Sequence, residues 1–252
     1  MSMPLLRYCG SLREYEERLR VGLEAYLELV EGSMGYPRER ELESASEALG
    51  LLDCDAACRT LQEVLGRLED AEVCVVTPAP GGLELLTKGG CERVVATDSS
   101  IETLAEAGRK PDVLVGDADP SLRLLGLALQ LGVPYLLHSH GDNLYRLKPL
   151  TGLLSRSAVI LTTQVETPYC TLPVGALTDG DRGAAIAMYF RASRVIINWL
   201  SSQGPSCEHK DLCDEGLKAL KLRLAQRVLT YMASRLGYRV EAAGDQIILE
   251  RA

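Results

Sequence analysis

Hydrophobic positions change their spacing twice along this chain. From about residue 11 to residue 70 they recur every three or four residues among Glu and Arg, which predicts amphipathic helices. The pattern is interrupted at Gly32-Ser33-Met34-Gly35 and resumes in two shorter helical runs at 40–51 and 55–68, the second with Asp55 as its N-cap. Residues 1–70 are therefore expected to form a helical N-terminal region.

After Glu72 the pattern becomes one of short apolar runs separated by helical stretches. Continuous Val, Ile and Leu runs of this length are typical of strands buried on both faces of a parallel sheet. Strands are predicted at 73–76, 94–96, 113–115, 135–137, 159–161 and 195–198. Helices are predicted at 83–88, 101–107, 122–131 and 182–191. This alternation predicts an α/β catalytic domain over residues 71–200, with a doubly wound, mostly parallel, Rossmann-like sheet.

Residues 201–252 form the third predicted unit. A long amphipathic helix is expected at about 211–235, followed by a β-hairpin at 238–250 that turns at Ala-Ala-Gly-Asp. Both elements are expected to pack on the α/β core. Apolar faces left exposed on the N-terminal helices would favour a homodimer.

Composition and charge exclude several classes of protein. Hydrophobic residues make up 46% of the 252 residues and charged residues 25%, as in ordinary globular chains. The net charge is −8, and no long run of Lys or Arg could follow a phosphate backbone, so a nucleic-acid partner is not expected. No stretch has the roughly 18 uninterrupted apolar residues of a membrane-spanning helix. The N-terminus also lacks a signal-peptide pattern, so a cytoplasmic protein with no membrane association is expected.

The chain has eight cysteines but no Cys-x-x-Cys pair. Cys74 and Cys91 lie beside predicted strands, where reduced cysteine behaves as a small hydrophobic residue. Cys54 and Cys58 would share one helix face. Arginine far outnumbers lysine and asparagine is nearly absent, which is typical of thermophiles, where intracellular disulfides occur. A further loose cluster could hold a metal, although it lacks the paired spacing of a tetrahedral zinc site: Cys207, His209 and Cys213.

The most informative residues are those that directly follow the predicted strands, because open α/β sheets bind ligands outside the carboxyl ends of their strands. Gly116-Asp117-Ala118-Asp119-Pro120 follows the third strand. Alternate aspartates in a turn can converge on one hard cation. A solvated turn that caps the next helix is the alternative.

His138-Ser139-His140-Gly141-Asp142-Asn143 follows the fourth predicted strand and holds two of the chain's three histidines. Each polar side chain here could be a metal ligand, a proton carrier or a hydrogen-bond donor to phosphate. Gly141 would allow the backbone to approach a ligand closely. The alternative is a set of polar residues whose hydrogen bonds are satisfied within the protein.

Thr178-Asp179-Gly180-Asp181-Arg182 lies at the start of a predicted helix. A helix N-terminus with arginine in its first turn favours an anion, and Asp179 and Asp181 could hold the accompanying cation. Asp181 could instead serve only as the helix cap.

Two further strand ends are weaker candidates. The loop from Thr77 to Gly82 could place the amides of Gly81 and Gly82 against a nucleotide, although it is neither a Walker loop nor a Gly-x-Gly-x-x-Gly motif. Asp98 follows the second strand. Since consecutive strand ends carry Asp, His or Gly, one shared site is the simplest interpretation.

With Thr162-Thr163-Gln164 added, these motifs occur in an order that resembles the archaeal 6-hydroxymethyl-7,8-dihydropterin diphosphokinase family, whose core is similar to the catalytic domain of thiamine pyrophosphokinases. The match covers about residues 73–198. The resemblance implies Mg²⁺-dependent transfer of a pyrophosphoryl group from ATP to the pterin hydroxymethyl group, with release of AMP, in folate or methanopterin-type biosynthesis.

The chain departs from the family pattern in two places. The loop from Thr77 to Gly82 is less rich in glycine at its start, and Asn198-Trp199-Leu200-Ser201 stands where the family tends to carry Gly-Met-Asp-Phe. The second departure removes a carboxylate near the expected pterin pocket.

Pyrophosphoryl transfer depends mostly on positioning and charge neutralisation. Asp117 and Asp119 are expected to hold Mg²⁺, with Asp142 and either Asp179 or Asp181 completing or doubling the metal site.

The other site residues are expected to bind the substrates or stabilise the reacting groups. Arg182 is expected to stabilise the charge on the transferring group, and His138 or His140 to contact phosphate or accept the hydroxyl proton. The residues expected to contact ATP or orient the pterin are Gly81, Gly82, Asp98, Asn143, Gln164 and Thr178.

Other functions fit part of the same pattern. A two-metal phosphoesterase would use His138 and His140 with Zn²⁺ or Mn²⁺ and would not need ATP. A nucleotide-binding protein without transferase activity would keep the cation site and lack the acceptor pocket, which the Asn198-Trp199 departure allows. A thiamine-type acceptor is disfavoured, because that family adds a β-rich domain and only a hairpin follows the core here.

Overall fold

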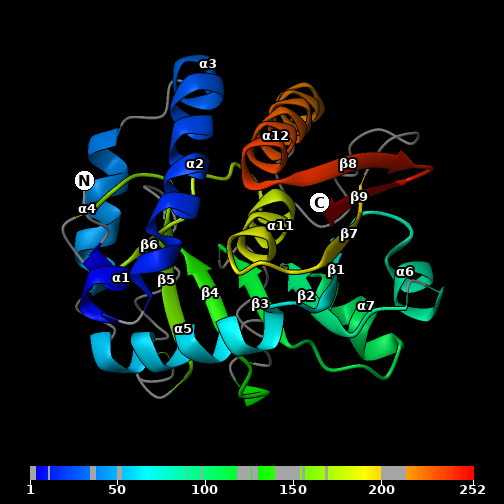
Figure 1. Cartoon of the computed structure of the whole chain (residues 1–252), viewed down its shortest axis with the longest axis horizontal. Helices are drawn as coiled ribbons and strands as arrows, with labels where there is room; N and C mark the ends of the chain where they lie inside the picture. The colour runs from blue at the N-terminus through cyan, green and yellow to red at the C-terminus, as the bar shows by residue number, and fades with distance from the viewer. Residues whose placement is uncertain are drawn as a thin grey trace.

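The fold is built around one nine-stranded sheet (Figure 1). In this computed structural model, the structure describes residues 4–10, 12–34, 38–49, 53–88, 90–97, 99–117, 126, 130–139, 154, 157–167, 170–199 and 214–252. The strands are β1 (Glu72–Val76), β2 (Arg93–Thr97), β3 (Val113–Gly116), β4 (Tyr135–His138), β5 (Val159–Thr163), β6 (Leu172–Pro173), β7 (Arg194–Asn198), β8 (Tyr238–Ala243) and β9 (Gln246–Arg251).

Helical segments cover this sheet, and several of them precede its first strand in the chain. The N-terminal ones are α1 (Pro4–Tyr8), η1 (Arg13–Tyr15), α2 (Glu16–Tyr26), η2 (Leu27–Glu31), α3 (Gly32–Met34), α4 (Arg38–Leu49) and α5 (Cys54–Leu68). Those within and after the sheet are α6 (Gly82–Lys88), α7 (Ser100–Glu106), α11 (Asp179–Tyr189) and α12 (Glu215–Leu236).

The sheet order is β6-β5-β4-β3-β2-β1-β7-β9-β8, and all pairs from β6 to β7 are parallel. The chain therefore moves outward from β1 to β6 and returns to β7 on the other side of β1. The C-terminal hairpin continues the sheet, because β9 pairs antiparallel with β7, for example Ile196 with Ile248. The expected α/β class with a mostly parallel sheet is confirmed.

Side chains that alternate along the strands supply two buried layers. In β1, Val73 and Val75 face the larger layer, which includes residues of α2, α5, α11 and α12. Cys74 and Val76 face the smaller layer, with residues of α6 and α7. The sheet is thus covered on both faces, which explains why its central strands are continuous apolar runs.

The N-terminal helices pack directly on α11. Arg18 donates to the last carbonyl groups of α11, from Nε to Tyr189 O at 3.0 Å and from Nη2 to Met188 O at 2.9 Å. A cation at this end also interacts favourably with the helix dipole. A Cβ at Gly22 would lie 1.7 Å from the Tyr189 hydroxyl oxygen, so only glycine allows α2 to approach this closely.

Most predicted elements are confirmed, with three corrections. β6 was not predicted, and α11 begins at Asp179, three residues before the predicted start at Arg182. The N-cap of α5 is Asp53, not Asp55, because the Asp53 side chain accepts from the Asp55 N–H at 2.9 Å. Most of the helix predicted at 122–131 lies outside the described residues.

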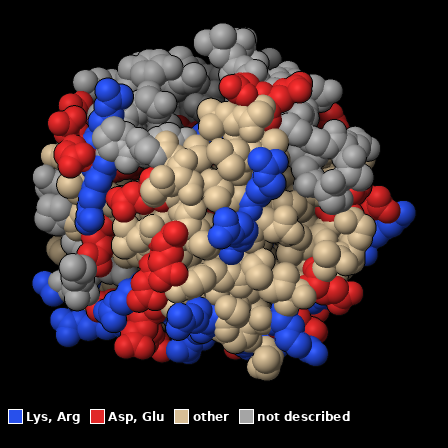
Figure 2. All heavy atoms as spheres, turned by 90° about the horizontal axis from the view of Figure 1, so that it is seen from above, with Lys and Arg blue, Asp and Glu red and all other residues tan. Residues whose placement is uncertain are grey.

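The described surface seen from above carries charges of both signs (Figure 2). Acidic and basic side chains are interspersed toward its margins, and basic side chains also stand on a broad uncharged area. No helix in the described part of the chain is long and apolar enough to cross a membrane.

Candidate functional site

The carboxyl ends of the parallel strands bring several predicted site residues to one edge of the sheet. His138 ends β4, Asp117 directly follows β3, and Thr97 ends β2. His138 and Thr97 are buried, whereas Asp117 is half-buried. Since neighbouring strands lie about 4.8 Å apart, β1 and β4 are separated by roughly 14 Å, a span that an extended nucleotide can bridge.

The end of β4 is fixed from two sides. Nδ1 of His138 lies 3.2 Å from Oγ1 of Thr162 on β5. The next residue, Ser139, is buried, and its hydroxyl lies 2.8 Å from that of Ser44 on α4. Helix α4 of the N-terminal region therefore reaches the carboxyl edge of the sheet, a contact that sequence spacing gave no reason to expect.

Gln164 is buried after β5, and its amide contacts protein groups on both sides. Oε1 accepts from the Tyr26 hydroxyl at 3.2 Å, and Nε2 donates to Ala176 O at 2.8 Å. The side chain thereby connects α2 with the segment before α11. These contacts indicate that Gln164 holds the two segments together. Its predicted role in orienting a substrate would use the second hydrogen of Nε2 or the second lone pair of Oε1.

Asp181 belongs to the cap of α11. It forms a capping box with Thr178, and its carboxylate also accepts from Leu177 N at 2.9 Å. The side chain is fully buried, and burial raises the pKa of this carboxyl, while hydrogen bonds from Leu177 and Thr178 and the charge of Arg182 act in the opposite direction. Both carboxylate oxygens accept from protein donors. These contacts favour the capping role for Asp181, and its role as a metal ligand stays a prediction.

Changing this cap should lower stability and leave nucleotide binding intact. Asp181→Asn replaces one acceptor by an NH₂ donor that would face an N–H group, so we expect a loss of about 2 kcal/mol in the free energy of unfolding. The Kd for Mg·ATP should change less than twofold in calorimetric titrations. Lost Mg²⁺-dependent ATP binding at an unchanged Tm would instead identify Asp181 as a ligand.

Asp179 and Arg182 form a buried ion pair in the first turn of α11. Nη1 of Arg182 contacts Oδ1 of Asp179, and the two side chains are 3% and 12% exposed. Nε of Arg182 is buried without a hydrogen-bond partner among the described residues. A buried donor that lacks a partner is costly, and a ligand anion at this helix N-terminus would satisfy it. The pair therefore suits anion binding better than direct coordination of a cation by Asp179.

The loop after β1 contains the predicted glycines. Gly81 has φ +87°, a conformation that favours glycine, and Gly82 begins α6. A Cβ at Gly82 would lie 3.1 Å from Cγ1 of Val76, so the loop packs closely on β1. The predicted role of this loop in nucleotide binding stays a prediction.

Several predicted site residues lie outside the described residues: Asp98, Asp119, His140, Asp142 and Asn143. The Cys207, His209 and Cys213 cluster also lies outside them. Within the described ranges, no group of three or more His, Cys, Asp or Glu side chains is arranged to hold a metal ion.

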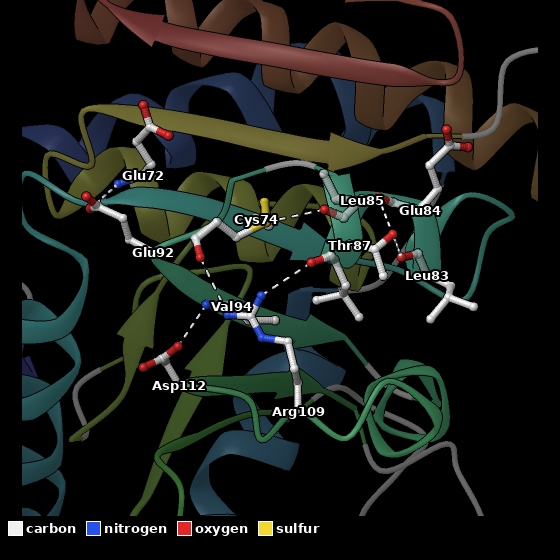
Figure 3. Close-up of a disulfide and its surroundings, with 12 residues drawn as sticks. Glu72, Cys74, Leu83, Glu84, Leu85, Thr87, Glu92, Val94, Arg109 and Asp112 are labelled. Atoms are coloured by element: carbon white, nitrogen blue, oxygen red, sulfur yellow. Dashed lines mark hydrogen bonds between the residues drawn. A yellow bond between two sulfur atoms is a disulfide. The ribbon is translucent and has the colours of Figure 1, made fainter.

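The described residues form three disulfide bonds: Cys9–Cys58, Cys54–Cys170 and Cys74–Cys91. Figure 3 shows Cys74 on β1, with residues of α6 and Arg109 close to it. Sγ of Cys91 lies 3.6 Å from Leu85 O, and Arg109 donates to Cys91 O at 3.5 Å. The prediction that Cys74 and Cys91 are separate small hydrophobic residues was wrong, because the crossover brings their Cα atoms to 5.5 Å.

No family model matches the chain. It is 28% identical over 223 residues to the 6-hydroxymethyl-7,8-dihydropterin pyrophosphokinase of Pyrococcus furiosus, a match that spans 82% of this chain and 91% of that protein. The protein of the same name from Methanocaldococcus jannaschii is 22% identical over 84% of this chain and 95% of its own length. That from Methanothermobacter thermautotrophicus is 27% identical over 59% of this chain and 66% of its own length.

Proposed function

Since the chain belongs to the family of archaeal 6-hydroxymethyl-7,8-dihydropterin pyrophosphokinases, we propose that it transfers a pyrophosphoryl group from ATP to the hydroxymethyl group of this pterin and releases AMP. We also propose that its α/β core has the fold of the catalytic domain of thiamine pyrophosphokinases.

The buried Arg182 at the N-terminus of α11 is the observation that carries the proposal. Its Nε has no hydrogen-bond partner among the described residues. A Cβ at the next residue, Gly183, would lie 3.4 Å from Cγ2 of Thr97, which places this turn at the sheet edge that also carries Asp117 and His138. A guanidinium and a helix N-terminus both bind phosphate oxygens. Asp179 holds the guanidinium in place through their ion pair, so Asp179 is proposed to orient Arg182.

Mg²⁺ is the proposed metal, and the chemistry of the donor set fits it. Asp117 directly follows a buried strand and is half-buried, so its hard carboxylate oxygens lie at the edge of the sheet. Asp119 and Asp142 are proposed as its companion ligands, since Asp179 already contacts Arg182 and Asp181 already accepts hydrogen bonds in the helix cap. When bound, Mg²⁺ would neutralise charge on the phosphate oxygens.

The protein residues would position the acceptor hydroxyl in line with the β-phosphorus of ATP. Arg182 would stabilise negative charge on the transferring group. His138 or His140 would accept the hydroxyl proton or contact phosphate, and the contact with Thr162 fixes the ring of His138 for either role.

The test is to incubate the purified protein with ATP, Mg²⁺ and 6-hydroxymethyl-7,8-dihydropterin, and to follow AMP by chromatography. We expect acceptor-dependent AMP, and Asp117→Asn should reduce its rate at least about a hundredfold. Asp112→Asn is the matched control, because Asp112 precedes the same strand at the opposite edge and accepts from Val94 N at 2.8 Å. It should stay within about twofold of wild type.

Other outcomes would support the alternative functions. Binding of Mg·ATP without AMP for pterin or thiamine would identify a nucleotide-binding protein. Phosphate release from esters without ATP would identify a phosphoesterase.

A further inference from the structure

We propose that Asn198 is a positioning residue that holds the β1–α6 loop, residues 77–82, in the conformation that binds the phosphates of ATP. The inference rests on the proposed function, because it names what prepares the nucleotide side of that site. Asn198 ends β7, next to β1 in the sheet. The chain reverses its direction of travel across the sheet between these two strands, and α/β proteins bind ligands at such a switch point.

The side chain of Asn198 contacts four backbone groups of one loop. Its Oδ1 accepts from Thr77 N at 2.8 Å. Its Nδ2 lies within hydrogen-bond distance of three carbonyl oxygens, those of Thr77 at 3.2 Å, Ala79 at 2.8 Å and Pro80 at 3.3 Å. Because Asn198 is fully buried, losing its amide would remove these contacts without giving the loop free access to water there.

The N–H groups of the loop fall into two sets, those that donate to protein atoms near the loop and those of Gly81 and Gly82. The Thr77 N–H is taken by Asn198, the Ala79 N–H donates to Thr77 Oγ1 at 3.2 Å, and the two prolines have no N–H. Gly81 and Gly82 carry the remaining N–H groups of residues 77–82. Their positions depend on the carbonyls that Asn198 holds, so Asn198 acts on any phosphate contact through them.

The held loop also packs against the first turn of α11. A Cβ at Gly180 would lie 3.2 Å from Cγ2 of Thr77 and 3.5 Å from Cζ3 of Trp199. This close fit fixes the loop and β7 relative to the turn that carries Arg182. Asn198 and Trp199, which depart from the family pattern, thus stabilise the nucleotide side of the site.

The experiment compares variants of the full-length protein by calorimetric titration with Mg·ATP and by steady-state kinetics. We expect Asn198→Ala to raise the Kd and KM for ATP at least about tenfold, with the KM for the pterin within about twofold. Thr77→Val should act in the same direction, because it removes the hydroxyl that donates to Asn198 O at 2.9 Å and accepts from Ala79 N. Thr77→Ser keeps that hydroxyl, so this variant should bind ATP with the same affinity as wild type.

Tyr238→Phe controls for a general loss of stability. The substitution removes the buried hydrogen bond, 2.6 Å long, that the Tyr238 hydroxyl donates to Ala192 O. Ala192 lies between α11 and β7. Tyr238→Phe should lower Tm without changing the KM for ATP.

The outcomes separate this inference from the proposed reaction. AMP formation by wild type together with an unchanged Kd in Asn198→Ala overturns the inference alone. If wild type makes no AMP but Asn198→Ala binds Mg·ATP more weakly than wild type does, the positioning role is supported and the proposed reaction is overturned. A wild type that does not bind Mg·ATP overturns both.

Discussion

Replacing Arg182 by lysine should lower kcat for AMP formation by about 10²- to 10³-fold. Lysine keeps the positive charge and can still pair with Asp179, but it loses the planar set of donors that includes the buried Nε. The missing donors would matter most when charge builds on the transferring phosphoryl group, so kcat should fall more than the KM for ATP changes.

The control lies at the other end of the same helix. Arg191, just after α11, pairs with Glu14 at 3.2 Å and stacks over the Tyr15 ring at 5.3 Å. Arg191→Lys should stay within about twofold of wild type in kcat, with both variants folded by circular dichroism. Wild-type kcat in Arg182→Lys would show that the guanidinium has only a structural role.

Reducing the disulfides should lower Tm by at least about 10 °C. The bonds join residues 49, 116 and 17 positions apart. In the chain-entropy model, a loop of 17 residues contributes about 3 kcal/mol and one of 116 residues nearly 5 kcal/mol, although nested loops do not add fully. For a chain of this size, 1 kcal/mol corresponds to roughly 2–4 °C in Tm.

Scanning calorimetry with and without reductant checks this prediction, and thiol counting in denaturant confirms the redox state. The double variant Cys74→Ser/Cys91→Ser isolates the shortest loop, which encloses α6. It should show a smaller fall in Tm than full reduction does. The same Tm in both redox states would mean that the disulfides do not stabilise the fold.

The sequence itself determined the α/β class and most of the central strands. Strands buried on both faces must be continuously apolar, so β1 to β5 and β7 are visible as short Val, Ile and Leu runs. The edge strand β6 has two residues and left no such pattern. The position of Asp117 and His138 at one edge also followed from the sequence, because parallel strands end together.

Only the tertiary structure decided what the polar side chains contact. Spacing left Asp181 as either a cap or a metal ligand, and full burial with donors from Leu177 and Thr178 favours the cap. The segment that begins at Asn198 stood out in the sequence only for lacking the family's carboxylate, yet Asn198 contacts Thr77, 121 positions earlier in the chain. Hydrogen bonds and disulfides between distant segments leave no periodic pattern, since they depend on which strands become neighbours.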